Sequence, residues 1–251
     1  MKFADHFSAR AAEYARYRPD YPPELFDWLA SVVGRRRLAW DCATGNGQAA
    51  LALASRFETV VASDASSAQL REATPHEGVR YVCATAERSP LGDRSVDLAT
   101  VAQALHWFDL DAFYREVRRV VVPGGAIAVW SYGLASIEPA VDALVLELYR
   151  DTLAGYWPPE RRHVDEKYRN LAFPFEEISA PAFAMERDWT LAALLGYLGT
   201  WSAVQRYQRA QGGEAIALIA GRLEEAWGDP ERKRKVRWPL AIRVGRVEGE
   251  R

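Results

Sequence analysis

The chain of 251 residues has a formal net charge of −2, with 49% hydrophobic and 26% charged residues, a composition typical of a soluble globular protein. No apolar run reaches the ~20 residues of a membrane-spanning helix, and the small net charge argues against a general nucleic-acid surface. The two cysteines, Cys42 and Cys83, indicate neither a disulfide framework nor a metal site, and the first residues lack the apolar core of a secretion signal. We therefore expect a cytoplasmic protein, a monomer or homodimer, that binds neither membranes nor nucleic acid.

Residues 1–23 are predicted to form an N-terminal arm. Apolar side chains at helical spacing extend to Tyr14, and the prolines between positions 19 and 23 prevent the helix from continuing. Tyr14 and Arg18 lie close together in the sequence, so an aromatic ring and a cation could close over a ligand and bind a carboxylate. The alternative is a helix that only covers a sheet edge.

Strands and helices then alternate. Strands are predicted at residues 38–40, 59–64, 79–83, 96–102 and 126–132, and helices at 23–33, 48–56, 67–73 and 109–121, with Ser66 or Ser67 and Asp109 as caps. This βαβ alternation predicts a doubly wound α/β fold with a mostly parallel sheet.

The second half of the chain interrupts the alternation. Residues 134–181 contain a helix at about 139–154 and an aromatic, basic loop, which we interpret as a helical cap insert. Two strands, at 183–189 and 238–247, enclose helices near 191–201 and 214–227, and the basic run 232–235 is predicted to be a solvated turn. We expect one domain over residues 1–251, divided into the arm, a core at 38–133, the insert, and C-terminal strands and helices at 182–247.

The most informative stretch is residues 38–48, which reads as a strand, a glycine turn and the start of a helix. Gly45 and Gly47 permit a tight turn with close backbone approach, and its N–H groups at a helix start would suit a polar ligand. Asp64 ends the next strand, 17 positions after Gly47. An acid there lies beside the turn in a doubly wound sheet and can accept hydrogen bonds from ribose hydroxyls.

The segment from Asp41 to Gly47 resembles the acid-x-Gly-x-Gly-x-Gly motif of class I S-adenosylmethionine-dependent methyltransferases, with Ala43 in place of the first glycine. The N-terminal pattern at 5–19, the stretch 103–108 and the stretch 200–207 resemble the methyltransferase type 11 group and its trans-aconitate methyltransferase-like subgroup. The resemblance implies a Rossmann-like seven-stranded sheet with an antiparallel last strand. It also implies S-adenosyl-L-methionine as cofactor, with S-adenosyl-L-homocysteine as product.

The resemblance and the strand ends together predict the site residues. Cofactor contacts are expected from Tyr14, Arg18, Asp41, Ala43, Gly45, Gly47, Asp64, Ala65, Gln69, Thr85, Ala86, Glu87 and Gln103. Substrate contacts are expected from Trp107, Tyr132, Trp157, Trp201, Arg206 and Tyr207. In the family an acid that meets the adenine amino group often stands at the position of Thr85. His106 is the candidate catalytic base, and its alternative role is to orient the end of the strand.

The predicted reaction is methyl transfer to a small molecule, which needs no metal because the reactive group belongs to the cofactor. A carboxylic acid is one possible acceptor, since its carboxylate is ionised at neutral pH and needs no base. Arg18, Arg161, Arg162 and Arg206 lie in segments expected to border the site and could bind a second carboxylate. Arginine is common throughout the chain, however, so general usage is the alternative explanation.

Three other functions are compatible with parts of the sequence. Residues 45–50 also satisfy the Gly-x-Gly-x-x-Ala fingerprint of nicotinamide-dependent oxidoreductases, although Asp41, the stretch 103–108 and the lack of a Tyr-x-x-x-Lys pair argue against that class. A protein that binds S-adenosylmethionine without catalysis is the second alternative. A nucleic-acid methyltransferase is the third, and the charge and the lack of a basic domain disfavour it.

Overall fold

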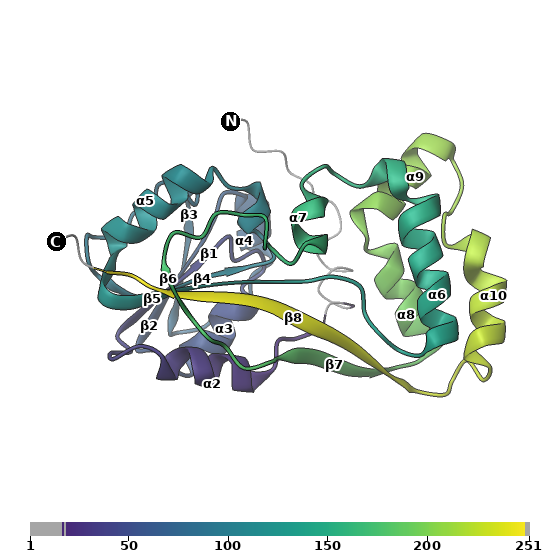
Figure 1. Ribbon diagram of the computed structural model, residues 1–251, viewed down its shortest axis with the longest axis horizontal. Helices are drawn as coiled ribbons and strands as arrows, with labels where there is room; N and C mark the ends of the chain where they lie inside the picture. Colours follow the sequence, from purple (N-terminus) through teal and green to yellow (C-terminus); the bar gives the residue numbers. More distant parts are fainter. Residues whose placement is uncertain (1–16, 18, 249–251) are drawn as a thin grey trace.

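The computed structural model describes residue 17 and residues 19–248 (Figure 1). The predictions for Tyr14 and Arg18 therefore lie outside the described residues. Within the described part of the chain, no helix is long and apolar enough to cross a membrane.

A mostly parallel sheet forms the larger part of the molecule (Figure 1). Its first five strands are parallel, in the order β3 (Val79–Cys83), β2 (Thr59–Asp64), β1 (Leu38–Cys42), β4 (Val96–Ala102) and β5 (Val121–Tyr132). The long strand β8 (Arg234–Arg246) runs antiparallel to β5, and β6 (Glu176–Ile178) pairs with it at the edge. These seven strands confirm the predicted fold class, and β7 (Ala184–Trp189) pairs with the other end of β8.

Apolar side chains on both faces of the central strands explain why helices cover both sides of the sheet. The helices are α2 (Pro23–Ser31) and α3 (Gln48–Ala54) on one face and α5 (Leu110–Val120) on the other, with the short α4 (Ser67–Arg71) after β2 (Figure 1). In β1, Ala39 packs in the cluster with α2 and α3, whereas Trp40 and Cys42 pack in the cluster with α5. Ser66 and Asp109 cap α4 and α5, as predicted.

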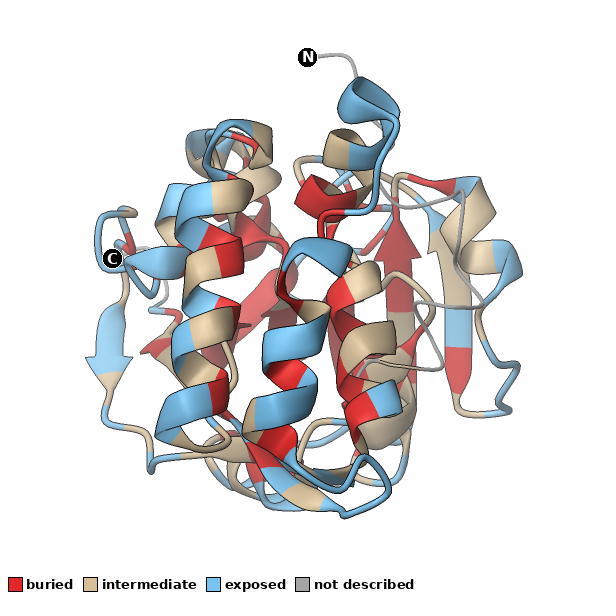
Figure 2. Cartoon of the chain, turned by 90° about the vertical axis from the view of Figure 1, so that its right-hand side faces the viewer, coloured by how far each residue is buried: buried red, intermediate tan, exposed pale blue. Residues whose placement is uncertain are grey.

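A second hydrophobic cluster holds a helical lobe beside the sheet. The lobe contains α6 (Pro139–Glu147), the π turn Leu148–Thr152, the 3-10 turn Ala154–Tyr156, α8 (Leu191–Gly199), α9 (Ser202–Gln211) and α10 (Ala217–Trp227), joined by β7 and the start of β8. Figure 2 shows the lobe helices with buried stripes turned toward one another and exposed residues outward. The cap thus draws its helices from two separate segments, only the first of which lies in the predicted insert.

The remainder of the predicted insert belongs to the sheet. Helix α7 (Arg161–Asp165) carries Val164 into the cluster around α5, and β6 extends the sheet edge. Figure 1 shows α7 between the sheet and the helical lobe.

Several elements differ from the sequence predictions. Helix α9 was not predicted, although Gly212 ends it in a left-handed conformation. Strand β6 was also not predicted, because three residues with two exposed acids give no apolar pattern. Strand β8 starts at Arg234 rather than at position 238, so the basic run is only partly a turn. Arg234 pairs with Trp189 in the ladder, forms an ion pair with Glu138 and stacks on the Trp227 ring.

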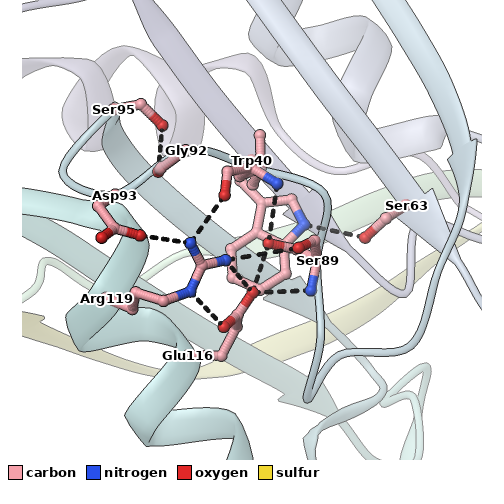
Figure 3. Close-up of polar contacts among 9 residues, drawn as sticks. Trp40, Ser63, Ser89, Gly92, Asp93, Ser95, Glu116 and Arg119 are labelled. Atoms are coloured by element: carbon pink, nitrogen blue, oxygen red, sulfur yellow. Dashed lines mark hydrogen bonds and ion pairs between the residues drawn. The ribbon is translucent and has the colours of Figure 1, made fainter.

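A buried polar network fixes the loop that follows β3. The carboxylate of Glu116 on α5 accepts hydrogen bonds from the backbone N–H and the hydroxyl of Ser89, at 2.7 and 2.6 Å. Arg119 bridges Glu116 and Asp93 and also donates to the Leu91 carbonyl (Figure 3). Ser89 and Asp93 are therefore both fastened to α5. The residues before them follow the end of β3, at the carboxyl edge of the sheet.

Candidate active site

The parallel strands bring most of the predicted residues to one edge. Asp41 to Gly47 follow β1, Asp64 to Gln69 follow β2, Thr85 to Glu87 follow β3, Gln103 to Trp107 follow β4, and Tyr132 ends β5. Because these strands all point the same way, their carboxyl ends meet where open α/β sheets bind ligands.

The glycine turn has a strained backbone. Ala43, Gly45 and Gly47 have φ values of 55°, 58° and 88°, so all three are left-handed. The conformation at Ala43 explains why the family motif has glycine there, since a side chain costs energy at positive φ. Most of the turn's N–H groups are already bonded within the protein, contrary to our expectation of an open cradle: those of Thr44, Gly45 and Gly47 donate to Ser63, Asp64 and Thr44.

Tyr81 on β3 packs directly against the turn. A Cβ atom added to Gly47 would lie 2.4 Å from the Tyr81 hydroxyl, which itself donates to the Thr74 carbonyl at 2.9 Å. A Cβ added to Gly45 would meet only the side-chain oxygen of Gln69, at 3.9 Å. A Cβ-sized group at Gly45 would thus clash with no atom, whereas at Gly47 it would clash with the Tyr81 ring. This geometry is compatible with a cofactor that approaches the turn at Gly45.

The Asp64 carboxylate joins the ends of β1 and β2. One oxygen accepts from the Gly45 N–H at 2.9 Å and the other from the Ser66 N–H at 2.8 Å. Each carboxylate oxygen can accept more than one hydrogen bond, so the side chain can brace the turn and still receive a ligand hydroxyl.

The buried Asp41 carboxylate at the end of β1 supports the turn through hydrogen bonds. Its oxygens accept from the hydroxyls of Thr44, at 2.5 Å, and Thr100, at 2.9 Å, and the residue is 1% exposed. Burial raises the pKa of Asp41 to about 6 despite these hydrogen bonds. The Asp41 carboxylate thus supports the turn, and its contact with a ligand stays a prediction.

The loops after β3 and β4 lie beside the turn. Thr85 is exposed, Ala86 is buried, and Glu87 accepts from the Asp109 N–H at 3.2 Å. Gln103 has a φ of 58°, and its side-chain amide donates to the Tyr132 carbonyl at 3.0 Å and accepts from the Tyr132 N–H at 3.1 Å. The Gln103 side chain thereby extends the ladder between β4 and β5, and its amide is already in use.

His106 lies on the 3-10 turn Leu105–Trp107, against the buried Tyr168. Its Nδ1 atom is 2.9 Å from the Tyr168 hydroxyl, and burial, with the charges of Arg161 and His163, lowers the pKa of His106 to about 3. Burial raises the pKa of Tyr168, so its hydroxyl keeps its proton at neutral pH and can donate it. We therefore assign the tyrosine proton to the bond with Nδ1, which leaves the hydrogen of the neutral imidazole on Nε2.

Helix α7 packs against the turn that carries His106. Its first residue, Arg161, contacts the rings of Tyr149 and Trp157. Trp157, a predicted substrate residue, packs on Tyr149 and Trp201 and donates its indole N–H to the Tyr149 carbonyl at 3.0 Å. This aromatic group connects the helical lobe to α7.

The other predicted substrate residues separate into two groups. Trp107 stacks on His106 and Tyr132 ends β5, so both lie at the sheet edge. Trp201 is 6% exposed and packs inside the lobe against Tyr149, Trp157 and Tyr197, which is a core position. Arg206 and Tyr207 lie on α9 and contact Tyr156.

The segment before α2 links the lobe to the glycine turn. The Tyr17 ring fills the space beside Gly196 on α8, where an added Cβ would lie 2.5 Å from it. The side chain of Gln48, the first residue of α3, donates to the Pro19 carbonyl and to Asp20. The described end of the arm thus touches both sides of the site.

The sequence reasoning missed Tyr81, Tyr149 and Tyr168. Tyr81 and Tyr149 give no special signal, because strand and helix patterns predict only that such residues are partly buried. Tyr168 has a φ of 58°, which is rare for an aromatic residue, yet nothing in its sequence context predicts it.

The comparisons with known proteins agree with this geometry. A family model described as a methyltransferase domain matches residues 40–129. A Dictyostelium discoideum protein classed as a methyltransferase is 34% identical over 230 residues, which cover 90% of this chain and 88% of that protein. The solved structure of an Anaeromyxobacter dehalogenans protein classed as a type II methyltransferase is 50% identical, with a TM-score of 0.88, and covers 93% of this chain and 100% of that one.

The matched region includes the glycine turn, Asp64 and the His106 turn, which are the parts that form the sheet edge described above. The two relatives extend the similarity through the helical lobe, because they align with nine tenths or more of the chain. The chain therefore belongs to the methyltransferase domain family and is a class I S-adenosylmethionine-dependent methyltransferase.

Proposed function

We propose that the protein transfers the methyl group of S-adenosylmethionine to a small carboxylic acid and forms a methyl ester. The observation that carries this proposal is the geometry of His106, the candidate base beside the sheet edge, whose Nδ1 atom is 2.9 Å from the Tyr168 hydroxyl and so is already in use. With a pKa lowered to about 3, its imidazole is a poor acceptor for the proton of a hydroxyl or an ammonium group. A carboxylate has already lost its proton at neutral pH and needs no base.

The cofactor is assigned to the turn after β1 and to the ends of β2 and β3. Gly45 offers the open backbone surface, Asp64 the ribose-binding carboxylate, and Thr85 a hydroxyl for the adenine edge. Ala65, Gln69, Ala86 and Glu87 complete this wall by their position in the same loops. Asp41, Ala43 and Gly47 shape the turn, and Gln103 shapes the strand ends.

Ester formation from a carboxylate needs no proton transfer. The acceptor oxygen bonds to the methyl carbon as the carbon–sulfur bond breaks, and the electron pair stays with sulfur, so no proton moves. The protein has to hold the two reactants in line, and well-oriented intramolecular reactions gain effective molarities of roughly 10⁵ M or more. Trp107 and Tyr132 are placed to flank the acceptor. The resemblance to the trans-aconitate methyltransferase-like subgroup supports an acid, and the free cysteines Cys42 and Cys83 support a cytoplasmic location.

The test is a transfer assay with S-adenosylmethionine labelled in its methyl group, across small di- and tricarboxylic acids, phenols and amines. We expect labelled methyl esters, identified by mass spectrometry and by their loss on mild alkaline hydrolysis. Methylation of phenols or amines in place of the acids would show that the acceptor class is wrong. Binding of cofactor with no transfer to any acceptor would favour the non-catalytic alternative.

A further inference from the structure

The guanidinium of Arg161 is held rigidly. Its Nε atom donates to the Tyr149 hydroxyl at 2.8 Å and lies 3.5 Å from the Asp165 carboxylate. Its central carbon lies 5.1 Å from the Trp157 ring centroid and 5.4 Å from that of Tyr149. A guanidinium with one nitrogen bonded and two aromatic rings beside its central carbon has lost much of its rotational freedom.

The two terminal nitrogens of the same guanidinium make no polar contact with a described residue. Among the described residues, neither terminal nitrogen of Arg161 has a hydrogen-bond acceptor or a carboxylate partner. The side chain is only 21% exposed, and the 45% exposed Asp165 reaches only the Nε side. Terminal guanidinium nitrogens are strong donors in a planar fork that matches a carboxylate, so this end of Arg161 is available to bind an anionic ligand.

The surroundings of this fork place it at the proposed methyl-acceptor site. Helix α7 packs on the turn that carries His106. The Arg161 charge adds to the burial that lowers the pKa of His106, and it opposes the burial that raises the pKa of Tyr168. The imidazole, with its hydrogen on Nε2, is itself a donor. The Trp107 ring packs against the imidazole at a tilt, with 4.7 Å between the ring centroids.

We propose that Arg161 is the residue that selects the acceptor, by binding through its two terminal nitrogens a carboxylate of the substrate that is not methylated. This inference rests on the proposed function and refines it, because it requires at least two carboxylates, one held and one methylated. Arg206, the arginine singled out in the sequence, instead donates to the Tyr156 carbonyl inside the lobe.

A purely structural role for Arg161 is the competing explanation, since its contacts also fasten α7 to the lobe. The chain offers a matched control in Arg162, which is adjacent, on the same helix and exposed. The variants are therefore Arg161→Gln, Arg162→Gln and Arg161→Lys, and the last keeps the charge but removes the fork. Thermal unfolding of each variant reports on the structural contribution alone.

The experiment is calorimetric titration of the protein saturated with S-adenosylhomocysteine, with succinate, citrate and phthalate as probes and inorganic phosphate as a different anion. We expect at least one dicarboxylate or tricarboxylate to bind, about 10- to 100-fold more weakly to Arg161→Gln, in the range for losing charge-assisted hydrogen bonds. Arg162→Gln should bind like the unmodified protein, and Arg161→Lys should be intermediate.

Equal binding by Arg161→Gln and Arg162→Gln, or no binding of any acid to the unmodified complex, would overturn the proposal. Tighter binding of phosphate than of every acid would show that the fork serves a different anion. If Arg161→Gln does not fold, Arg161→Lys decides, because unchanged acid binding with its fork removed contradicts the assignment. Failure of S-adenosylhomocysteine to bind would instead contradict the proposed function, so the two failures are distinct.

Discussion

The Asp64 carboxylate accepts a hydrogen bond from the backbone N–H of Gly45 at 2.9 Å, so the acid at the end of β2 and the glycine turn after β1 form one unit. We propose that the same acid has two tasks, because it fixes the turn and would accept hydrogen bonds from the cofactor ribose. A change at Asp64 should then affect cofactor binding through both.

Asp64→Ala is expected to weaken S-adenosylmethionine binding by about 1 to 3 kcal/mol, the range for hydrogen bonds that involve a charged group. Calorimetry measures the affinity, and circular dichroism verifies that the variant is folded. Asp27→Ala, at an exposed acid on α2 whose ion-pair partner among the described residues is Arg56, is the control. Unchanged affinity in a folded Asp64→Ala protein would remove this residue from the cofactor site.

Gly47 and Gly45 should differ in their tolerance of a side chain. Both have positive φ, but only at Gly47 would a Cβ meet the Tyr81 hydroxyl, at 2.4 Å. Gly47→Ala should therefore lower the melting temperature more than Gly45→Ala does. It should also lower the cofactor affinity. Gly34→Ala, where no atom lies within 4 Å, should change neither. Equal melting temperatures for the Gly45 and Gly47 variants would contradict the role assigned to Tyr81.

Much of this edge could be predicted from the sequence, because its signals are local. The spacing from Gly47 to Asp64, the capping by Asp109 and the periodicity of the central strands all depend on neighbours along the chain. The contacts of Gly47 with Tyr81 and of His106 with Tyr168 join residues that are far apart in sequence. No local pattern contains them, and this is why the closed side of the turn and the state of the imidazole were not foreseen.

The helical lobe was harder to predict for a related reason. A cap was expected from residues 134–181, yet α7 and β6 of that segment pack against the sheet, and α8 to α10 supply most of the lobe. Helical periodicity predicts that a face is buried without saying against which element. Trp201 shows the same limit, since the resemblance of residues 200–207 to the subgroup implied a substrate contact, with a core position as the alternative, and its side chain lies in the lobe core.

The contact between Tyr17 and Gly196 predicts that a change in the lobe reaches the cofactor. Gly196→Ala should displace the Tyr17 ring, whose segment continues to the residues bonded to Gln48 beside the glycine turn. We expect weaker binding of S-adenosylhomocysteine by calorimetry. The control is Gly221→Ala on α10, where no atom lies within 4 Å. It should leave binding intact and raise the stability by up to about 1 kcal/mol through helix propensity. Intact binding in both variants would contradict this coupling.

The buried Asp41 should make stability depend on pH. Burial raises its pKa from 3.8 to about 6, so the folded protein binds this proton more tightly than the unfolded chain. The resulting stabilisation is complete below pH 3.8 and is lost as the pH rises through about 6. Relative to Asp41→Asn, the unmodified protein should lose about 3 kcal/mol of unfolding free energy across this window. Urea unfolding at several pH values measures the difference, and parallel curves for the two proteins would contradict the raised pKa.

The most direct test of the central claim is a pair of calorimetric titrations of the unmodified protein and Asp64→Ala, one with S-adenosylhomocysteine and one with NADH. Both ligands carry an adenosine that an acid at the end of β2 could hold, so the comparison separates the methyltransferase site from the nicotinamide alternative that residues 45–50 also permit. We predict that S-adenosylhomocysteine binds with one-to-one stoichiometry, that Asp64→Ala weakens this binding, and that NADH gives no saturable heat. Saturable binding of NADH without binding of S-adenosylhomocysteine would contradict the account.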